Sequence, residues 1–190
     1  MTALLDIAVL IGSLRTNSLS RKLVTTLTAL APPSIKLELI EIAALSFYNE
    51  DEDSSPPAPW VSFRQRIKRA DALLFVTAEY NRSIPAALKN ALDVGSRPYG
   101  QSAWNGKPAG VVSFSPGTIG GFAANHHLRQ SLVALNVLTL PQPEVYLGGL
   151  SDNAFDEKGV CVNAGTNAFL GKFMTTYAAW IAREPSKTVA

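Results

Sequence analysis

Three short and almost wholly apolar runs constrain the fold of this chain more than any other feature. They read DIAVLI at 6–11, ALLFVT at 72–77 and AGVVSF at 109–114. Continuous apolar runs of this length are typical of parallel strands that are buried on both faces. Each run is followed by a segment with helical spacing, at 19–30, 86–94 and 120–135. Strands that alternate with helices indicate a parallel sheet covered on both faces, because right-handed crossovers place a helix over each connection.

The remaining segments complete this pattern. KLELIEI at 36–42 alternates as an edge strand would, 137–147 is a proline-interrupted last strand, and further helices are expected at 60–70 and 166–183. Five strands in 190 residues predict a single domain, 1–190, with an α/β doubly wound sheet. A domain of this size favours the flavodoxin-like order 2-1-3-4-5, with the larger six-strand dinucleotide fold as the alternative. In such sheets ligands bind beyond the carboxyl ends of the strands, so the loops after the first, third and fourth strands matter most.

Composition excludes several classes of function. The net charge is +2 and the basic residues are spread along the chain, so no nucleic-acid partner is expected. No uncharged apolar run is long enough to span a membrane and no signal peptide is recognisable, which predicts a cytoplasmic protein without a membrane partner. Cys161 stands alone, and His126 and His127 are adjacent, so neither a disulfide nor a metal site is predicted.

The loop after the first strand is rich in groups that bind phosphate. Residues 12–22 read GSLRTNSLSRK, with four hydroxyls, Arg15 and the backbone amides of a helix N-terminus. These groups supply the donors and the positive charge that a phosphate monoester needs. The loop lacks the glycine patterns of nucleotide hydrolases and of dinucleotide folds. The alternative is that Ser18 only caps the helix and that the other polar residues are solvated.

The loop after the third strand, 77–93, offers Tyr80 and Asn81. A flat heteroaromatic ring needs an apolar surface against its face and hydrogen-bonding groups along its edge, and both could come from here. The alternative interpretation is a tight turn that Asn81 closes.

Taken together, three motifs resemble the NADPH-dependent FMN reductase family, which includes bacterial quinone, chromate and azo-dye reductases. They are GSLRxxS from Gly12, EYNxSIPxxLKNALD from Glu79 and SPGTIGG from Ser115. The resemblance covers roughly residues 6 to 150 and implies FMN as the cofactor. It implies that Ser13, Arg15, Asn17 and Ser18 hold the FMN phosphate, that Glu79, Tyr80 and Asn81 line the isoalloxazine, and that Ser115, Gly117, Gly120 and Gly121 approach its other edge.

The implied activity is an NAD(P)H-dependent reduction of a small acceptor in a ping-pong sequence. NADPH or NADH delivers a hydride to FMN, which passes it to a quinone, free flavin, azo compound or chromate, and no catalytic acid or base is assigned because the cofactor carries the chemistry. The resemblance also implies a homodimer, with a homotetramer as the alternative. Some tetrameric members pair an arginine at the position of Ala123 with a glutamate matching Glu144, and Ala123 removes that pair.

Two other functions fit the same fold. A flavodoxin-type carrier that serves a protein partner usually presents an acidic face, which a chain of net charge +2 does not suggest. A phospho-receiver needs clustered carboxylates at strand ends, but Asp6 lies at the start of its strand.

Overall fold

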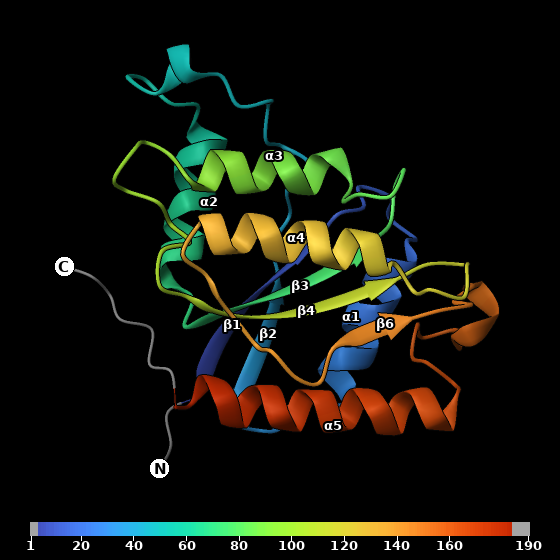
Figure 1. Cartoon of the computed structure of the whole chain (residues 1–190). Helices are drawn as coiled ribbons and strands as arrows, with labels where there is room; N and C mark the ends of the chain where they lie inside the picture. The colour runs from blue at the N-terminus through green and yellow to red at the C-terminus, as the bar shows by residue number, and fades with distance from the viewer. Residues whose placement is uncertain (1–3, 184–190) are drawn as a thin grey trace.

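A parallel sheet organises the residues that the computed structural model describes, 4–183. The strands follow the order β2-β1-β3-β4-β5, which confirms the expected fold class (Figure 1). The first four strands in the chain are β1 (Leu5–Ile11), β2 (Ile35–Leu39), β3 (Ala72–Ala78) and β4 (Pro108–Phe114). The sheet is therefore built in the flavodoxin-like order.

The fifth position of the sheet is shared by two short strands. Both β5 (Leu138–Thr139) and β6 (Val145–Leu147) pair in parallel with β4. Pro141 and Pro143 lie between them. Proline has no backbone N–H to donate to a ladder, so the chain leaves the sheet there and returns. The predicted proline-interrupted strand is thus confirmed as two pieces.

Helices cover both faces of the sheet, as Figure 1 shows. α1 (Leu19–Ala29) and α5 (Ala164–Ile181) pack on one face. α2 (Ala58–Arg69), α3 (Ala86–Gly95) and α4 (Phe122–Ala134) pack on the other. Short 3₁₀ turns occur at Glu50–Glu52 and Asp152–Ala154. None of the helices within 4–183 is long and apolar enough to cross a membrane.

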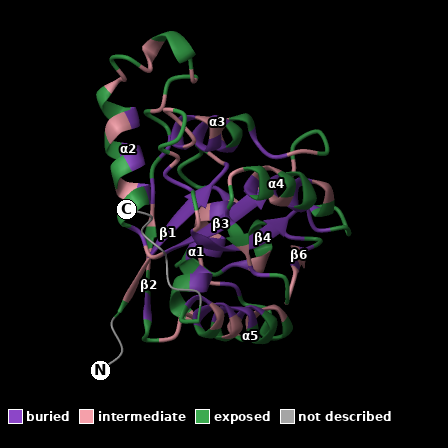
Figure 2. Cartoon of the chain, turned by 60° about the vertical axis from the view of Figure 1, so that its left-hand side comes forward, coloured by how far each residue is buried: buried purple, intermediate pink, exposed green. Residues whose placement is uncertain are grey.

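Burial follows the apolar runs of the sequence. All seven residues of β4 and the first six of β3 are buried, and these two strands are coloured purple in the interior of Figure 2. Side chains on alternate sides of each strand enter the two cores, so a strand covered on both faces has no solvent-exposed side. Trp60 and Trp104 are fully buried in the core under α2, α3 and α4, and Cys161 is buried in the core under α1 and α5.

Candidate functional site

A cavity of about 770 Å³ opens where β1, β3 and β4 end. Because these strands are parallel neighbours, the loops that follow them meet at one edge of the sheet. The wall has three parts: the loop and helix start at 12–20, the turn and helix start at 78–86, and residues 114–116. Its size lies in the range of sites for drug-sized ligands and cofactors, which span ~300–1,000 Å³.

The first loop presents hydroxyls at the start of α1. Ser18 is the N-cap of this helix, and its Oγ accepts a hydrogen bond from Arg21 N at 3.3 Å. A hydroxyl that accepts in this way keeps its O–H to donate. Ser13 Oγ accepts from Arg15 N at 3.3 Å, so it is held at the mouth of the loop in the same way. Capping and anion binding are therefore compatible at Ser18.

Ser20 is a wall residue of this cavity that the sequence did not single out beyond its hydroxyl. Its side chain is fully buried, yet among the described residues Oγ has no hydrogen-bond partner. A buried hydroxyl without a partner is costly, and the first turn of α1 has backbone N–H groups of its own to satisfy. The chemistry of this wall thus fits an acceptor-rich group such as the FMN phosphate, with Arg15 beside it.

The second loop is a tight turn. Tyr80 N donates to Ser83 O at 2.8 Å, and Ser83 N donates to Tyr80 O at 2.9 Å. The two residues between them, Asn81 and Arg82, have φ values of +48° and +62°. Asparagine tolerates this left-handed region better than arginine does. The turn interpretation of Asn81 therefore holds, and the turn places Tyr80, a residue that is 63% exposed, beside the cavity.

Glu79 makes contacts that the sequence did not predict. Its Oε2 accepts hydrogen bonds from Ala123 N at 3.0 Å and Ala124 N at 3.2 Å, and its Oε1 pairs with Arg82 at 3.1 Å. The N-cap position of α4 is Gly121, which has no side chain to cap the helix. The carboxylate of Glu79 thus caps α4 from a distant part of the chain, and its charge suits the positive end of the helix dipole.

A buried polar network fixes the third loop, residues 115–121, against the end of β4. Ser113 Oγ donates to Gly120 O at 3.0 Å, and Asn125 Nδ2 donates to Ser113 Oγ at 3.1 Å. Gly120 and Gly121 have φ values of +61° and +75°. A Cβ on Gly120 would lie 2.6 Å from the Tyr146 carbonyl carbon. These two glycines are required by backbone conformation and by packing against neighbouring strands.

Eight of the predicted cofactor residues line at least one of three hollows, and three glycines line none of them. Six of the eight line the large cavity, namely Ser13, Arg15, Ser18, Glu79, Tyr80 and Ser115. Asn17 lines an adjacent depression with Thr16 and Arg21, and Asn81 lines a second cavity between α3 and α4. Gly117, Gly120 and Gly121 are absent from the lining of the large cavity. Wall residues that the prediction lacked include Gly12, Ser20, Pro85 and Phe114.

The two adjacent histidines lie on α4, where each contacts a hydroxyl group. His127 Nδ1 lies 3.1 Å from Ser83 Oγ, and His126 Nε2 lies 3.2 Å from the Tyr146 hydroxyl. Burial, reinforced by the nearby Glu144 carboxylate, raises the pKa of Tyr146 to about 12, so this phenol is neutral at physiological pH. Within residues 4–183, no group of three or more His, Cys, Asp or Glu residues could hold a metal ion.

Comparisons with known proteins agree with this geometry. The family model described as NADPH-dependent FMN reductase matches residues 5–152. A quinone reductase of Pseudomonas putida is 53% identical over 95% of this chain and 97% of its own length. A 2-hydroxy-1,4-benzoquinone reductase of Burkholderia sp is 43% identical over 93% of this chain and 96% of its own length.

A solved structure extends the likeness to three dimensions. FerB, a flavoenzyme NAD(P)H:(acceptor) oxidoreductase from Paracoccus denitrificans, superposes with a TM-score of 0.90 at 36% identity. The superposition covers 95% of this chain and 99% of FerB. Fold, motifs and relatives point the same way, and the chain belongs to the NADPH-dependent FMN reductase family.

Proposed function

We propose that this protein is an FMN-dependent NAD(P)H oxidoreductase that reduces small acceptors, quinones first among them. One observation carries the proposal: a hydroxyl-rich helix start with Arg15 and an exposed tyrosine share one cavity at the carboxyl edge of the sheet. FMN, when bound, supplies the hydride chemistry that no side chain can perform. The names of the Pseudomonas and Burkholderia relatives support a quinone as the acceptor.

The residues of the chain bind FMN and orient its ring system. Ser13, Ser18 and Ser20 supply hydroxyl donors for the phosphate, and Arg15 supplies a charge-assisted hydrogen bond. Tyr80 offers an aromatic surface for the ring system. The large exposed fraction of Tyr80 leaves room for a second substrate to approach from solvent. A cytoplasmic location, a homodimer and the alternative homotetramer stay predictions, as do the roles of the individual site residues.

The alternative of a flavodoxin-type carrier predicts a different behaviour. A flavodoxin of Pseudomonas aeruginosa shares the fold with a TM-score of 0.55 at 16% identity, which concerns the fold alone. A carrier would need a protein partner to be reduced, whereas a reductase oxidises NAD(P)H directly.

An absorption experiment tests the proposal. The purified protein is reconstituted with FMN, desalted and treated anaerobically with NADPH. We expect a flavin absorption band near ~450 nm to survive desalting and to bleach on addition of NADPH. A colourless protein would refute FMN binding, and a yellow protein that neither NADPH nor NADH reduces would favour the carrier.

Replacing Arg15 tests the phosphate cradle. We expect Arg15→Gln to raise the Kd for FMN about tenfold, because a charge-assisted hydrogen bond to phosphate contributes ~1.5–3 kcal/mol and an exposed one lies at the low end. Fluorescence titration with FMN and with riboflavin, which lacks the phosphate, measures the effect. The riboflavin Kd should be unchanged. An equal weakening for both ligands would show that Arg15 does not act on the phosphate.

A further inference from the structure

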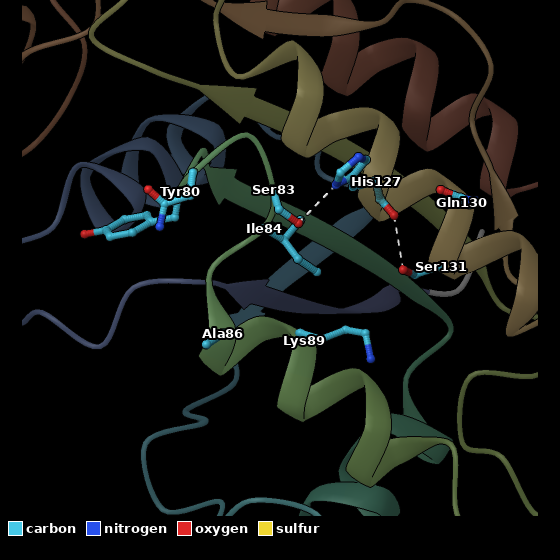
Figure 3. A pocket seen from close by; sticks show the side chains of 9 residues that line it. Tyr80, Ser83, Ile84, Ala86, Lys89, His127, Gln130 and Ser131 are labelled. Atoms are coloured by element: carbon cyan, nitrogen blue, oxygen red, sulfur yellow. Dashed lines mark hydrogen bonds between the residues drawn. The ribbon is translucent and has the colours of Figure 1, made fainter.

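A second cavity, of about 500 Å³, lies between α3 and α4. Figure 3 shows that Lys89 comes from α3, Gln130 and Ser131 from α4, and Ser83 from the turn before α3. Tyr80 and Ala86 line this cavity and the large cavity alike. The two spaces are therefore neighbours that meet at Tyr80, and one ligand can reach from the first into the second.

The wall of the second cavity carries positive charge and hydrogen-bond donors. Its nine lining residues include Lys89, His127, two serines and two carboxamides, and none of them is acidic. Ile84 and Ala86 supply its apolar part. The Asp93 carboxylate that pairs with Lys89 does not line this cavity, so a ligand that enters it meets one ammonium group, several neutral donors and no carboxylate among the lining residues. Such a wall suits an anionic group better than a cationic one.

An ion pair positions the Lys89 ammonium group and leaves one of its N–H donors available to a ligand. Its Nζ lies 2.7 and 2.8 Å from the two carboxylate oxygens of Asp93, one helical turn along α3. An ammonium group has three N–H donors, so one remains for a ligand. Both side chains are about half exposed, at 52% and 42%, and exposed pairs of this kind are weak. A ligand phosphate or enolate can therefore compete with Asp93 for the ammonium group.

His127 is oriented in a similar way. Its Nδ1 lies 3.1 Å from Ser83 Oγ, the contact drawn as a dashed line in Figure 3. The described residues show no hydrogen-bond partner for its Nε2, so this atom stays free for a ligand. Ser83 itself is fixed by two backbone hydrogen bonds to Tyr80. The turn that presents Tyr80 thus also fixes one side of the second cavity.

We infer that the cavity between α3 and α4 binds the anionic group of the second substrate through Lys89 and His127. The inference rests on the proposed function, since it assumes that the second substrate occupies the flavin cavity beside Tyr80. Two substrates of the proposed reaction carry such a group: the 2′-phosphate of NADPH, and the ionised hydroxyl of a hydroxyquinone. The shared chemistry is an oxyanion placed beside an ammonium and an imidazole.

The test uses the FMN-loaded protein, the variants Lys89→Gln and His127→Gln, and Lys172→Gln as the matched control. Lys172 is exposed on α5, on the opposite face of the sheet. Calorimetry measures binding of 2′,5′-ADP against 5′-AMP, which differ by the 2′-phosphate. Steady-state kinetics give the kcat/KM ratios of NADPH to NADH and of 2-hydroxy-1,4-benzoquinone to 1,4-benzoquinone.

The two sources of the anion give different results. If NADPH supplies the anion, Lys89→Gln lowers the NADPH:NADH ratio of kcat/KM about tenfold and weakens the binding of 2′,5′-ADP by the same factor. The kcat/KM ratio of the two quinones is then unchanged. If the hydroxyquinone supplies it, the quinone ratio falls about tenfold and the nucleotide ratio does not change. His127→Gln shifts the affected ratio in the same direction, by about threefold, and Lys172→Gln shifts neither.

Ratios that stay within about twofold of the wild-type values in Lys89→Gln and His127→Gln would overturn the inference. Failure of the proposed function is recognised separately. In that case the wild-type protein would not bind FMN, or would bind it without oxidising either nucleotide.

Discussion

Adding a single methyl group at Gly12 should lower both the stability of this protein and its affinity for FMN. A Cβ at this position would lie 2.6 Å from Pro85 Cγ and 3.0 Å from two other ring carbons of Pro85. Pro85 is the N-cap residue of α3, and both Gly12 and Pro85 line the large cavity. Overpacking of this kind costs ~1–3 kcal/mol. We expect Gly12→Ala to lower the free energy of unfolding by about 2 kcal/mol.

The same contact should weaken FMN binding, because relieving it moves the phosphate-binding loop away from α3. We expect the Kd for FMN to rise at least ~tenfold, the equivalent of 1.4 kcal/mol. Urea denaturation and fluorescence titration measure the two effects.

A double-mutant cycle with Pro85→Ala isolates the contact. Removing the ring carbons Cγ and Cδ should restore ~1 kcal/mol or more to the Gly12→Ala protein. Gly171→Ala is the matched control, since a Cβ there meets nothing within 4 Å and the position is helical. This control should be neutral or slightly stabilising, as alanine favours helix. Additive effects of Gly12→Ala and Pro85→Ala would show that the two residues do not interact.

Removing the Glu79 carboxylate should have a comparable effect by another route. In Glu79→Ala, the N–H groups of Ala123 and Ala124 lose their acceptor and Arg82 loses its partner. The Glu79 side chain is only 9% exposed, so water replaces its hydrogen bonds to the two amides poorly, whereas the 73% exposed Arg82 is readily solvated. Loss of a helix cap costs ~0.5–2 kcal/mol and loss of a buried charged partner adds to it. We expect the free energy of unfolding to fall by about 2 kcal/mol.

Glu79 also ties the turn that presents Tyr80 to α4, so its removal should weaken FMN binding as well. Glu79→Gln keeps an oxygen that the two amides can use, and its stability should lie between those of wild type and Glu79→Ala. Asp152→Ala is the control for an exposed ion pair, because it breaks only the pair with Lys22 and should cost less than ~1 kcal/mol. A Glu79→Ala protein as stable as the Asp152→Ala control would refute the capping role.

Much of the fold could be predicted because its pattern is local. A run such as ALLFVT at 72–77 has no polar face, so both of its faces need to be buried, as they are in a sheet covered on both sides. Crossover handedness predicts the parallel sheet with helices on both faces, and domain size favours the flavodoxin-like order over the larger dinucleotide fold. The order itself has no direct signal in the sequence. The predicted bounds of most helices and strands lie within a few residues of those in the structure. A helix such as α1, for example, begins after a capping serine that is visible in the sequence.

The site was predictable only in part. The polar loop after β1 and the motif around Tyr80 could be read as ligand-binding because their residue types are unusual for plain turns. Glu79 shows where this reasoning ends. The motif predicts that Glu79 lines the cofactor ring, and this stays a prediction. No local pattern indicates that the carboxylate of Glu79 also caps a helix 44 residues further along the chain.

The amino-acid sequence by itself determined the alternation of buried strands and helices, the family and the loops that carry the site. Hydrophobic patterning and capping act between residues that are close in the chain, so they are visible in one dimension. Only the tertiary structure decided that Pro85 meets Gly12, that Glu79 caps α4, and that Lys89 faces a cavity with His127. These contacts depend on how separate elements pack against the sheet, and side-chain volume and hydrogen-bond geometry across such distances leave no local pattern to read.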